Sequence, residues 1–220
     1  MAGNPTLWLD TSTMDTCLAL VVENKVLTQR IAEASALDFI FDELAGMFLE
    51  TGVRFPDIES IHFTCGPGSS LGLRIACMAL STWKTAFPSL ELRAARTLPI
   101  YAALHAQDPS SPNEFRLLAQ HRKDSWYHIQ SSQDGLTKMN AIDDAQVAKL
   151  EGHLYHLRQR KFATPPPRSS QPLQPNLQAL PTILQDENLF QSVEKPTVFP
   201  ETTPSFKKWI PQRHKKAGVK

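Results

Sequence analysis

A glycine-rich corner holds the residues whose types and spacing best suit chemistry. An apolar strand enters it, an apolar helix leaves it, and its residues are Gly66, Pro67, Gly68, Ser69 and Ser70. Glycines around a proline let the backbone turn sharply, and Ser69 or Ser70 can accept a hydrogen bond from the first free N–H groups of the helix. Free amides at a helix start attract anions. The residues therefore predict an anion-binding loop or, equally well, a corner that is simply tight.

Two carboxylates, Asp10 and Asp15, lie in the turn 10–16 after the first apolar strand, with Thr11 and Ser12 between them. A phosphate-binding turn needs a glycine for close backbone approach, and this turn has none. It also has no neighbouring Lys or Arg, and Asp15 would repel a phosphate. Asp10 could hold a hydrated Mg²⁺, but a single carboxylate at a strand end more often serves the turn itself. We therefore expect no ATP or metal bound by the chain alone.

The histidines and nucleophilic side chains add little further chemistry. His153 and His156 are spaced to share a helix face, but no third metal ligand accompanies them, so surface histidines are expected. Cys65, Ser69 and Ser70 have no recognisable His or Asp companions for nucleophilic catalysis. The sequence predicts no metal site and no catalytic residue.

The cysteines and the hydropathy pattern indicate the compartment. Cys17, Cys65 and Cys77 are odd in number and lie in apolar surroundings, which is typical of reduced core residues. The sequence begins with no charged-then-apolar leader, and no apolar run reaches transmembrane length. We expect a soluble, cytoplasmic protein that is not bound to a membrane.

The elements that must position the corner alternate in a recognisable order. Strands are expected at 6–10, 16–23, 25–32, 58–64 and 90–95, and helices at 35–51, 71–87 and 98–106. Three antiparallel strands followed by alternating helix and strand form the order of a ribonuclease-H-like half of the actin-like (ASKHA) α/β fold. The fold class predicted is therefore α/β and actin-like.

A turn-rich stretch, 108–113, divides the chain into two predicted units, 1–108 and 109–220. The first has 7 Lys/Arg and 12 Asp/Glu, a net charge of −5, and the second has 16 and 10, a net charge of +6. This asymmetry indicates partners of opposite sign.

The second unit is smaller and diverged. It is expected to open with a hairpin at 115–120 and 125–131, followed by a helix at 142–159. The helix would be capped by Asp143 or Asp144, and its apolar face would carry Val147, Leu150, Leu154 and Leu157. The proline-rich segment 164–200 cannot form a regular helix or a central strand. The basic tail 207–220 is expected to be a solvated end.

Two motifs resemble one protein family. Gly66 to Ser69 and Gly72 to Ile75 resemble the GPGSFTGLRIG signature of the TsaB (YeaZ) family, with Ser70 and Leu71 in place of Phe-Thr and Ala76 in place of the last Gly. Upstream, Leu7 to Thr13 resembles that family's opening strand and DTST turn. The two motifs occur in order and at the family's spacing. The resemblance extends from residue 1 to about residue 104, is weak to about 131, and is absent beyond.

The resemblance implies a function. TsaB-like proteins are non-catalytic partners of TsaD in making threonylcarbamoyladenosine on tRNA, beside the anticodon. It implies a heterodimer with a TsaD-like protein, a third member like the ATPase TsaE, and a homodimer when TsaD is absent. ATP or ADP, Mg²⁺ and tRNA would then be met only within the complex, and Gly68, Ser69 and Arg74 would shape the corner.

Both long helices are predicted to offer a face to that partner. On 35–51, the stripe Leu37, Ile40, Phe41, Leu44, Met47 and Phe48 is expected to enter the core. Phe39 and Gly46 then fall on the opposite side, among acidic residues, where a glycine lets another helix approach closely. The helix 71–87 carries no charge from Ile75 to Trp83 and has small residues on part of its surface. The predicted interface comprises Phe39, Asp42, Glu43, Gly46, Glu50, Gly72, Ala76, Ala79 and Trp83.

Other functions stay open at this point. A small actin-fold enzyme, a kinase or a peptidase, would use the same cleft and would turn over ATP or bind it alone. A homodimeric interaction protein that has lost TsaD is a further alternative. The tail could also contact tRNA directly through clustered Lys and Arg, with Trp209 stacking on a base.

Overall fold

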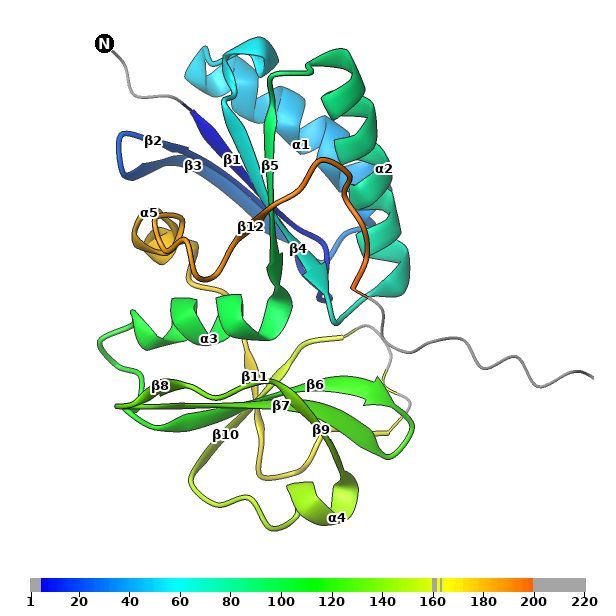
Figure 1. The fold of residues 1–220 in the computed structure, drawn as a ribbon, viewed down its shortest axis with the longest axis vertical. Helices are drawn as coiled ribbons and strands as arrows, with labels where there is room; N and C mark the ends of the chain where they lie inside the picture. The colour runs from blue at the N-terminus through cyan, green and yellow to red at the C-terminus, as the bar shows by residue number, and fades with distance from the viewer. Residues whose placement is uncertain (1–4, 160–161, 163, 200–220) are drawn as a thin grey trace, which may run out of the picture.

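The computed structural model describes residues 5–159, 162 and 164–199. The chain forms two six-stranded sheets, one above the other in Figure 1, with the helix α3 (Thr97–Ala106) between them. The predicted tail 207–220 lies outside the described residues.

The first sheet contains β1 (Thr6–Asp10), β2 (Thr16–Val22), β3 (Lys25–Ala32), β4 (Ser60–Gly66), β5 (Glu91–Arg96) and β12 (Gln191–Ser192). Its strand order is β12-β5-β4-β1-β2-β3. The meander β1-β2-β3 is antiparallel, whereas β4 pairs parallel to β1 and β5 parallel to β4. The strands β1 to β5, and their order along the chain, are those that the sequence predicts, whereas β12 was not predicted. The chain has an actin-like α/β fold.

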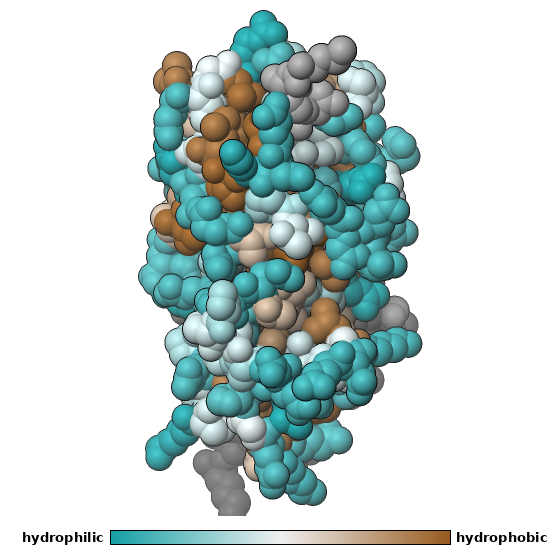
Figure 2. All heavy atoms as spheres, turned by 90° about the vertical axis from the view of Figure 1, so that its left-hand side faces the viewer, coloured by the Kyte–Doolittle hydropathy of each residue, from teal (hydrophilic) through white to brown (hydrophobic). Residues whose placement is uncertain are grey.

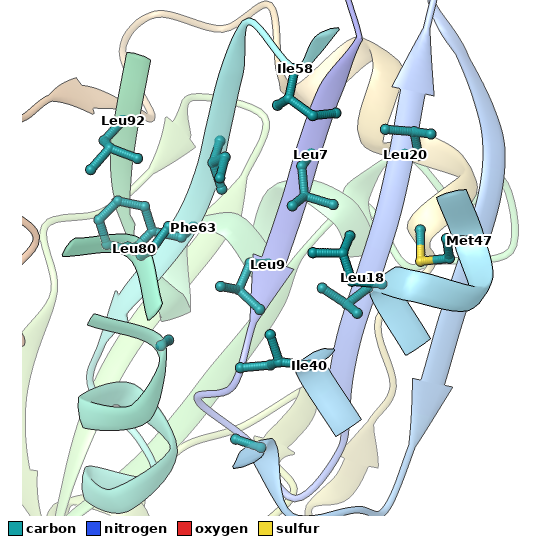
Figure 3. Close-up of a cluster of buried hydrophobic side chains, with 14 of the residues drawn as sticks. Leu7, Leu9, Leu18, Leu20, Ile40, Met47, Ile58, Phe63, Leu80 and Leu92 are labelled. Atoms are coloured by element: carbon teal, nitrogen blue, oxygen red, sulfur yellow. The ribbon is translucent and has the colours of Figure 1, made fainter. Parts of the chain in front are cut away.

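Helices cover both faces of this sheet. The helix α1 (Ala36–Thr51) and the helix α2 (Ser70–Ala86) lie on one face, and α3 and α5 (Leu180–Ile183) lie on the other. Because side chains alternate along a strand, Leu7 and Leu9 enter the core under α1 and α2 while Trp8 enters the opposite core. Figure 3 shows the first core, in which Leu9, Leu18 and Ile40 face one another.

The second sheet has the order β11-β10-β6-β7-β8, with β9 paired to β7. Its strands are β6 (Phe115–Arg122), β7 (Ser125–Ser132), β8 (Gly135–Leu136), β9 (Asn140–Asp143), β10 (His153–Leu157) and β11 (Gln171–Leu173). The predicted hairpin is β6–β7 and is confirmed. One face of this sheet packs against α3 through Phe115, Leu117 and Tyr127.

The helix predicted at 142–159 is wrong. Asp143 does cap a helix, α4, but α4 spans only Asp144–Val147. Gly152 then takes a φ of +83°, which ends any helical path, and His153–Leu157 pairs parallel to β6 as β10. Leu154 and Leu157 are buried as predicted, but their burial comes from a strand whose two faces enter different clusters.

The proline-rich segment returns to the first sheet. The 3-10 turn η2 (Leu177–Ala179) and α5 bury Leu177, Leu180 and Ile183 against the Trp8 face, and β12 adds a two-residue edge strand beside β5. The segment's described residues, 164–199, therefore form two short edge strands, β11 and β12, the turn η2 and the short helix α5, as prolines allow. The turn at 108–113 separates the two sheets, yet residues 177–193 pack with the first of them.

No helix among the described residues is both long and apolar enough to cross a membrane. Figure 2 turns the side with α5 and the β2–β3 turn toward the reader. Hydrophilic residues cover most of that face, and apolar residues gather in patches over its upper and middle parts.

Candidate protein interface

The carboxylate of Asp10 is enclosed by donors of the same chain. Ser12 donates to Oδ1 from its backbone N at 2.8 Å and from Oγ at 2.6 Å, and Thr64 donates to Oδ1 from Oγ1 at 2.5 Å. Tyr101 donates to Oδ2 at 2.7 Å. Asp10 is 1 % exposed. These contacts join β1, β4 and α3, so Asp10 acts as a structural anchor.

The glycine-rich corner is pressed against the same turn. Ser69 N donates to the carbonyl oxygen of Ser12 at 2.7 Å, and Ser69 Oγ accepts from Gly72 N at 3.3 Å, which confirms Ser69 as the N-cap. A Cβ atom on Gly68 would collide with the Ser12 carbonyl, and one on Gly72 would collide with the Thr11 carbonyl. The geometry favours the tight corner over the anion loop.

The remaining members of the predicted anion loop lie around this contact. Gly66 takes a φ of +115°, and Pro67 follows it as a buried residue. Ser70 is the first residue of α2, and Arg74 is exposed one turn later. Anion binding by these residues stays a prediction.

Asp15, which was expected to repel a phosphate, is neutralised by Arg158 at the end of β10. The Arg158 Nη1 lies 2.8 Å from both carboxylate oxygens of Asp15, and the guanidinium also pairs with Glu33. Met14 N donates to the Arg158 carbonyl at 2.9 Å. Burial raises the pKa of Asp15, and the Arg158 charge opposes that rise. Nothing in the sequence identifies Arg158, which ties the second sheet to the first.

The helix α1 is rotated relative to the prediction. Phe39 is 6 % exposed and lies in the core, so its predicted place on the outer face is wrong. Leu37, predicted to be buried, is 56 % exposed, and Phe41 is exposed too. Apolar residues occupy more than half of this helix's circumference, so their spacing alone does not fix which side enters the core.

Ion pairs with β3 accompany this rotation of α1. Arg30 pairs with Glu43 at 3.1 Å and also with Glu50, and both carboxylates lie on the Phe39 side of α1. Packing in the core turns Phe39 inward, and the exposed ion pairs add little to this orientation. Glu43 and Glu50, which were predicted to face a partner, therefore bind within the chain. Gly46, on the same side, borders open space.

The two helices leave an apolar groove between them, with a volume of about 450 Å³. We call it the α1–α2 groove, and it is lined by Leu37, Phe41, Leu71, Ile75, Met78, Ala79, Thr82 and Trp83. Leu71 and Met78 are 70 % and 72 % exposed, and the Phe41 and Trp83 rings meet edge to face at 6.2 Å. All eight lining residues are uncharged. A surface of this kind is typical of a protein-binding site.

The predicted interface residues of α2 divide between this groove and the core. Ala79 and Trp83 line the groove, and their contact with a partner stays a prediction. Gly72 packs on the Thr11 backbone and Ala76 lies in the core, so their predicted place at a partner surface is wrong. Their small size lets α2 approach its own sheet. Asp42 is exposed on α1 but does not line the groove.

Sequence reasoning missed Leu37, Phe41, Leu71 and Met78 as surface residues. Leu71 did carry a signal, because it stands where the resembling signature has a polar Thr. This exchange adds apolar surface to the first turn of α2.

Comparisons with known proteins agree on the fold. No family model matches the chain, and no curated protein matches it. The solved structure of YeaZ from Pseudomonas aeruginosa matches with a TM-score of 0.67 at 19 % identity, covering 89 % of this chain and 99 % of that chain. A structure described as an uncharacterized protein with similarity to peptidase YEAZ from Pseudomonas aeruginosa matches with a TM-score of 0.65 at the same identity and coverage. The chain therefore has the fold of YeaZ over most of its length.

Proposed function

We propose that this protein belongs to the TsaB (YeaZ) family and is a non-catalytic scaffold for a TsaD-like protein. In this role it would promote transfer of the threonylcarbamoyl group to the adenosine beside the tRNA anticodon. The observation that carries the proposal is the α1–α2 groove, an uncharged surface with large exposed side chains on a YeaZ fold. The two sequence motifs support it independently.

Covering the groove would supply free energy for binding a partner protein. Covering apolar surface contributes about 25 cal/mol per Å², and Leu71, Met78, Leu37 and Phe41 each present a large exposed side chain. The acidic residues Asp38 and Asp42 lie exposed on the same helix. The partner should therefore bring an apolar helical face with a basic rim.

The non-catalytic role is supported by the hydrogen bonds, the ion pair and the burial that occupy the polar and thiol side chains. Asp10 is saturated by four donated hydrogen bonds, and Asp15 is held by Arg158. Burial raises the pKa values of Cys65 and Cys77, which lowers the reactivity of both thiols. We propose that ATP and Mg²⁺ are met in the complex, where TsaE-like and TsaD-like members supply the chemistry.

A charge placed in the groove tests the proposal. The double variant Leu71→Glu/Met78→Glu should weaken binding to a purified TsaD-like protein by at least about 100-fold in calorimetry, because two carboxylates would be buried unpaired. Leu49→Glu is the matched control, since Leu49 is 88 % exposed on α1 but does not line the groove. Unchanged binding by the double variant with a native circular dichroism spectrum would refute this use of the groove.

The alternatives give different results in the same preparation. A small actin-fold enzyme would hydrolyse ATP, or cleave peptides, without any partner. A homodimeric interaction protein would sediment as a dimer, lose that dimer in the double variant, and bind no TsaD-like protein. The scaffold proposal predicts that a TsaD-like protein displaces any homodimer, because both would use the same groove.

A further inference from the structure

A cavity of about 370 Å³ lies between the end of β5 and residues 188–199, which we call the returning segment. Ala94, Ala95 and Arg96 at the end of β5 line it together with Cys65 of β4, and Phe190 and Phe199 line it from the returning segment. β4 and β5 are parallel, so their carboxyl ends open here. Open α/β sheets bind ligands outside the carboxyl ends of their strands.

The cavity contains a cation that no described carboxylate neutralises. Arg96 is exposed, and its guanidinium lies 4.5 Å from the centroid of the Phe199 ring. Arg93, on the same strand, differs because it pairs with Glu91 at 2.9 Å and does not line the cavity. A guanidinium stacked on a ring keeps its in-plane N–H groups free to donate to an anion.

The start of α3 adds to this positive field. α3 begins at Thr97 directly after Arg96, and within the described chain no side chain caps it. Thr97 is fully buried, and its Oγ1 has no hydrogen-bond partner among the described residues. Pro99 of the same first turn lines the cavity. The unsatisfied amides of a helix start favour a negative group.

The remaining walls are largely apolar. Phe190 and Phe199 contribute rings, and Leu189, Val193 and Val198 contribute branched side chains. Such walls suit the body of an organic molecule, whereas Arg96 and the α3 start suit only its charged end.

We propose that this cavity binds a small organic anion. Its carboxylate, sulfonate or phosphate group lies at Arg96 and the start of α3, and its aromatic or branched body lies between the two phenylalanine rings. This site is separate from the groove and does not depend on the function proposed above.

Ligand binding should also reduce local opening of the returning segment. Phe199 N donates to the Cys65 carbonyl at 2.7 Å, and Val193 N donates to the Leu92 carbonyl at 2.9 Å. Both hydrogen bonds border the cavity, so an occupant that touches both walls should slow hydrogen exchange at these two amides.

A pair of dyes tests the proposal. 8-Anilinonaphthalene-1-sulfonate carries a sulfonate, and N-phenyl-1-naphthylamine has the same aromatic body without charge. Titrations use the full chain carrying Leu71→Glu/Met78→Glu, so that the groove does not contribute fluorescence. The anionic dye should bind about tenfold more tightly than the neutral one, and Arg96→Gln should remove this difference.

Two further variants serve as controls. Arg93→Gln should leave the preference for the anionic dye unchanged, and Arg96→Lys should keep part of it because the charge remains. Slower exchange at Phe199 N on adding the anionic dye would support the proposal. Equal binding of the two dyes, or equal preference in Arg96→Gln and the parent, would overturn it.

Discussion

The Asp10 turn lies at the start of α2, the α1–α2 groove lies between the two helices, and they differ in what the fold leaves free. In the turn, the carboxylates that suggested chemistry are used inside the molecule: Asp10 accepts four hydrogen bonds, and Asp15 pairs with Arg158. In the groove, large apolar side chains stay exposed. The polar motif therefore stabilises the fold, whereas the uncovered apolar surface carries the proposed binding.

The largest effect on stability is expected at the turn. Asp10→Ala should lower the free energy of unfolding by about 3–5 kcal/mol, because buried hydroxyls of Ser12, Thr64 and Tyr101 lose their shared acceptor. Urea denaturation measures this loss, with the exposed Asp42→Ala as control. A loss below 1 kcal/mol would mean that the turn is not a structural anchor.

Two glycines sharpen the contrast between the regions. Gly72→Ala should destabilise the fold by about 2–4 kcal/mol because its methyl group meets the Thr11 carbonyl. Gly46→Ala, in open space on α1, should instead stabilise it by up to about 1 kcal/mol through helix propensity. Thermal unfolding of the two variants should therefore shift in opposite directions, and shifts of the same sign would contradict the close contact at Gly72.

His62, a buried histidine on the opposite face of the first sheet, should make the free energy of unfolding depend on pH. Burial beneath Phe190 and the Arg93 charge lower the pKa of His62 from 6.5 to about 3. Between these two values the unfolded chain binds more protons than the folded one, so stability is complete above pH 6.5 and falls as the pH falls. The loss should reach about 2 kcal/mol at pH 5. His62→Leu should flatten this part of the urea-denaturation profile, and an unchanged slope would show that His62 is protonated in the fold.

The smallest effect on stability is expected in the groove. Met78→Glu should change the free energy of unfolding by less than about 0.5 kcal/mol, since its side chain is already exposed. A loss of several kcal/mol in the isolated monomer would mean that the groove is covered by the chain itself, and the contrast with the turn would fail.

The order of elements could be predicted because strand alternation and helix signals are local. The strands 6–10 and 25–32 and the α1 end at Gly52 are found where the sequence placed them. The rotation of α1 could not be predicted, because it depends on tertiary contacts: Phe39 packs in the core, and Glu43 pairs with Arg30 of β3. The helix expected at 142–159 failed because parallel pairing with β6 outweighs a helical spacing of leucines.

The candidate site could be predicted only in part, for the same reason. The groove residues Ala79 and Trp83 could be predicted because the helix around them carries no charge, which is a local property of the sequence. Arg158 on Asp15 and Phe199 on Arg96 join residues far apart in the sequence, and no local pattern records them.

Site-specific photocrosslinking tests the central claim most directly. A benzophenone amino acid at position 78, in the full chain mixed with a TsaD-like protein, should crosslink to that protein, and the same group at position 49 should not. Crosslinking from position 49 alone, or from neither position in a complex that forms, would contradict the assignment of the α1–α2 groove as the partner surface.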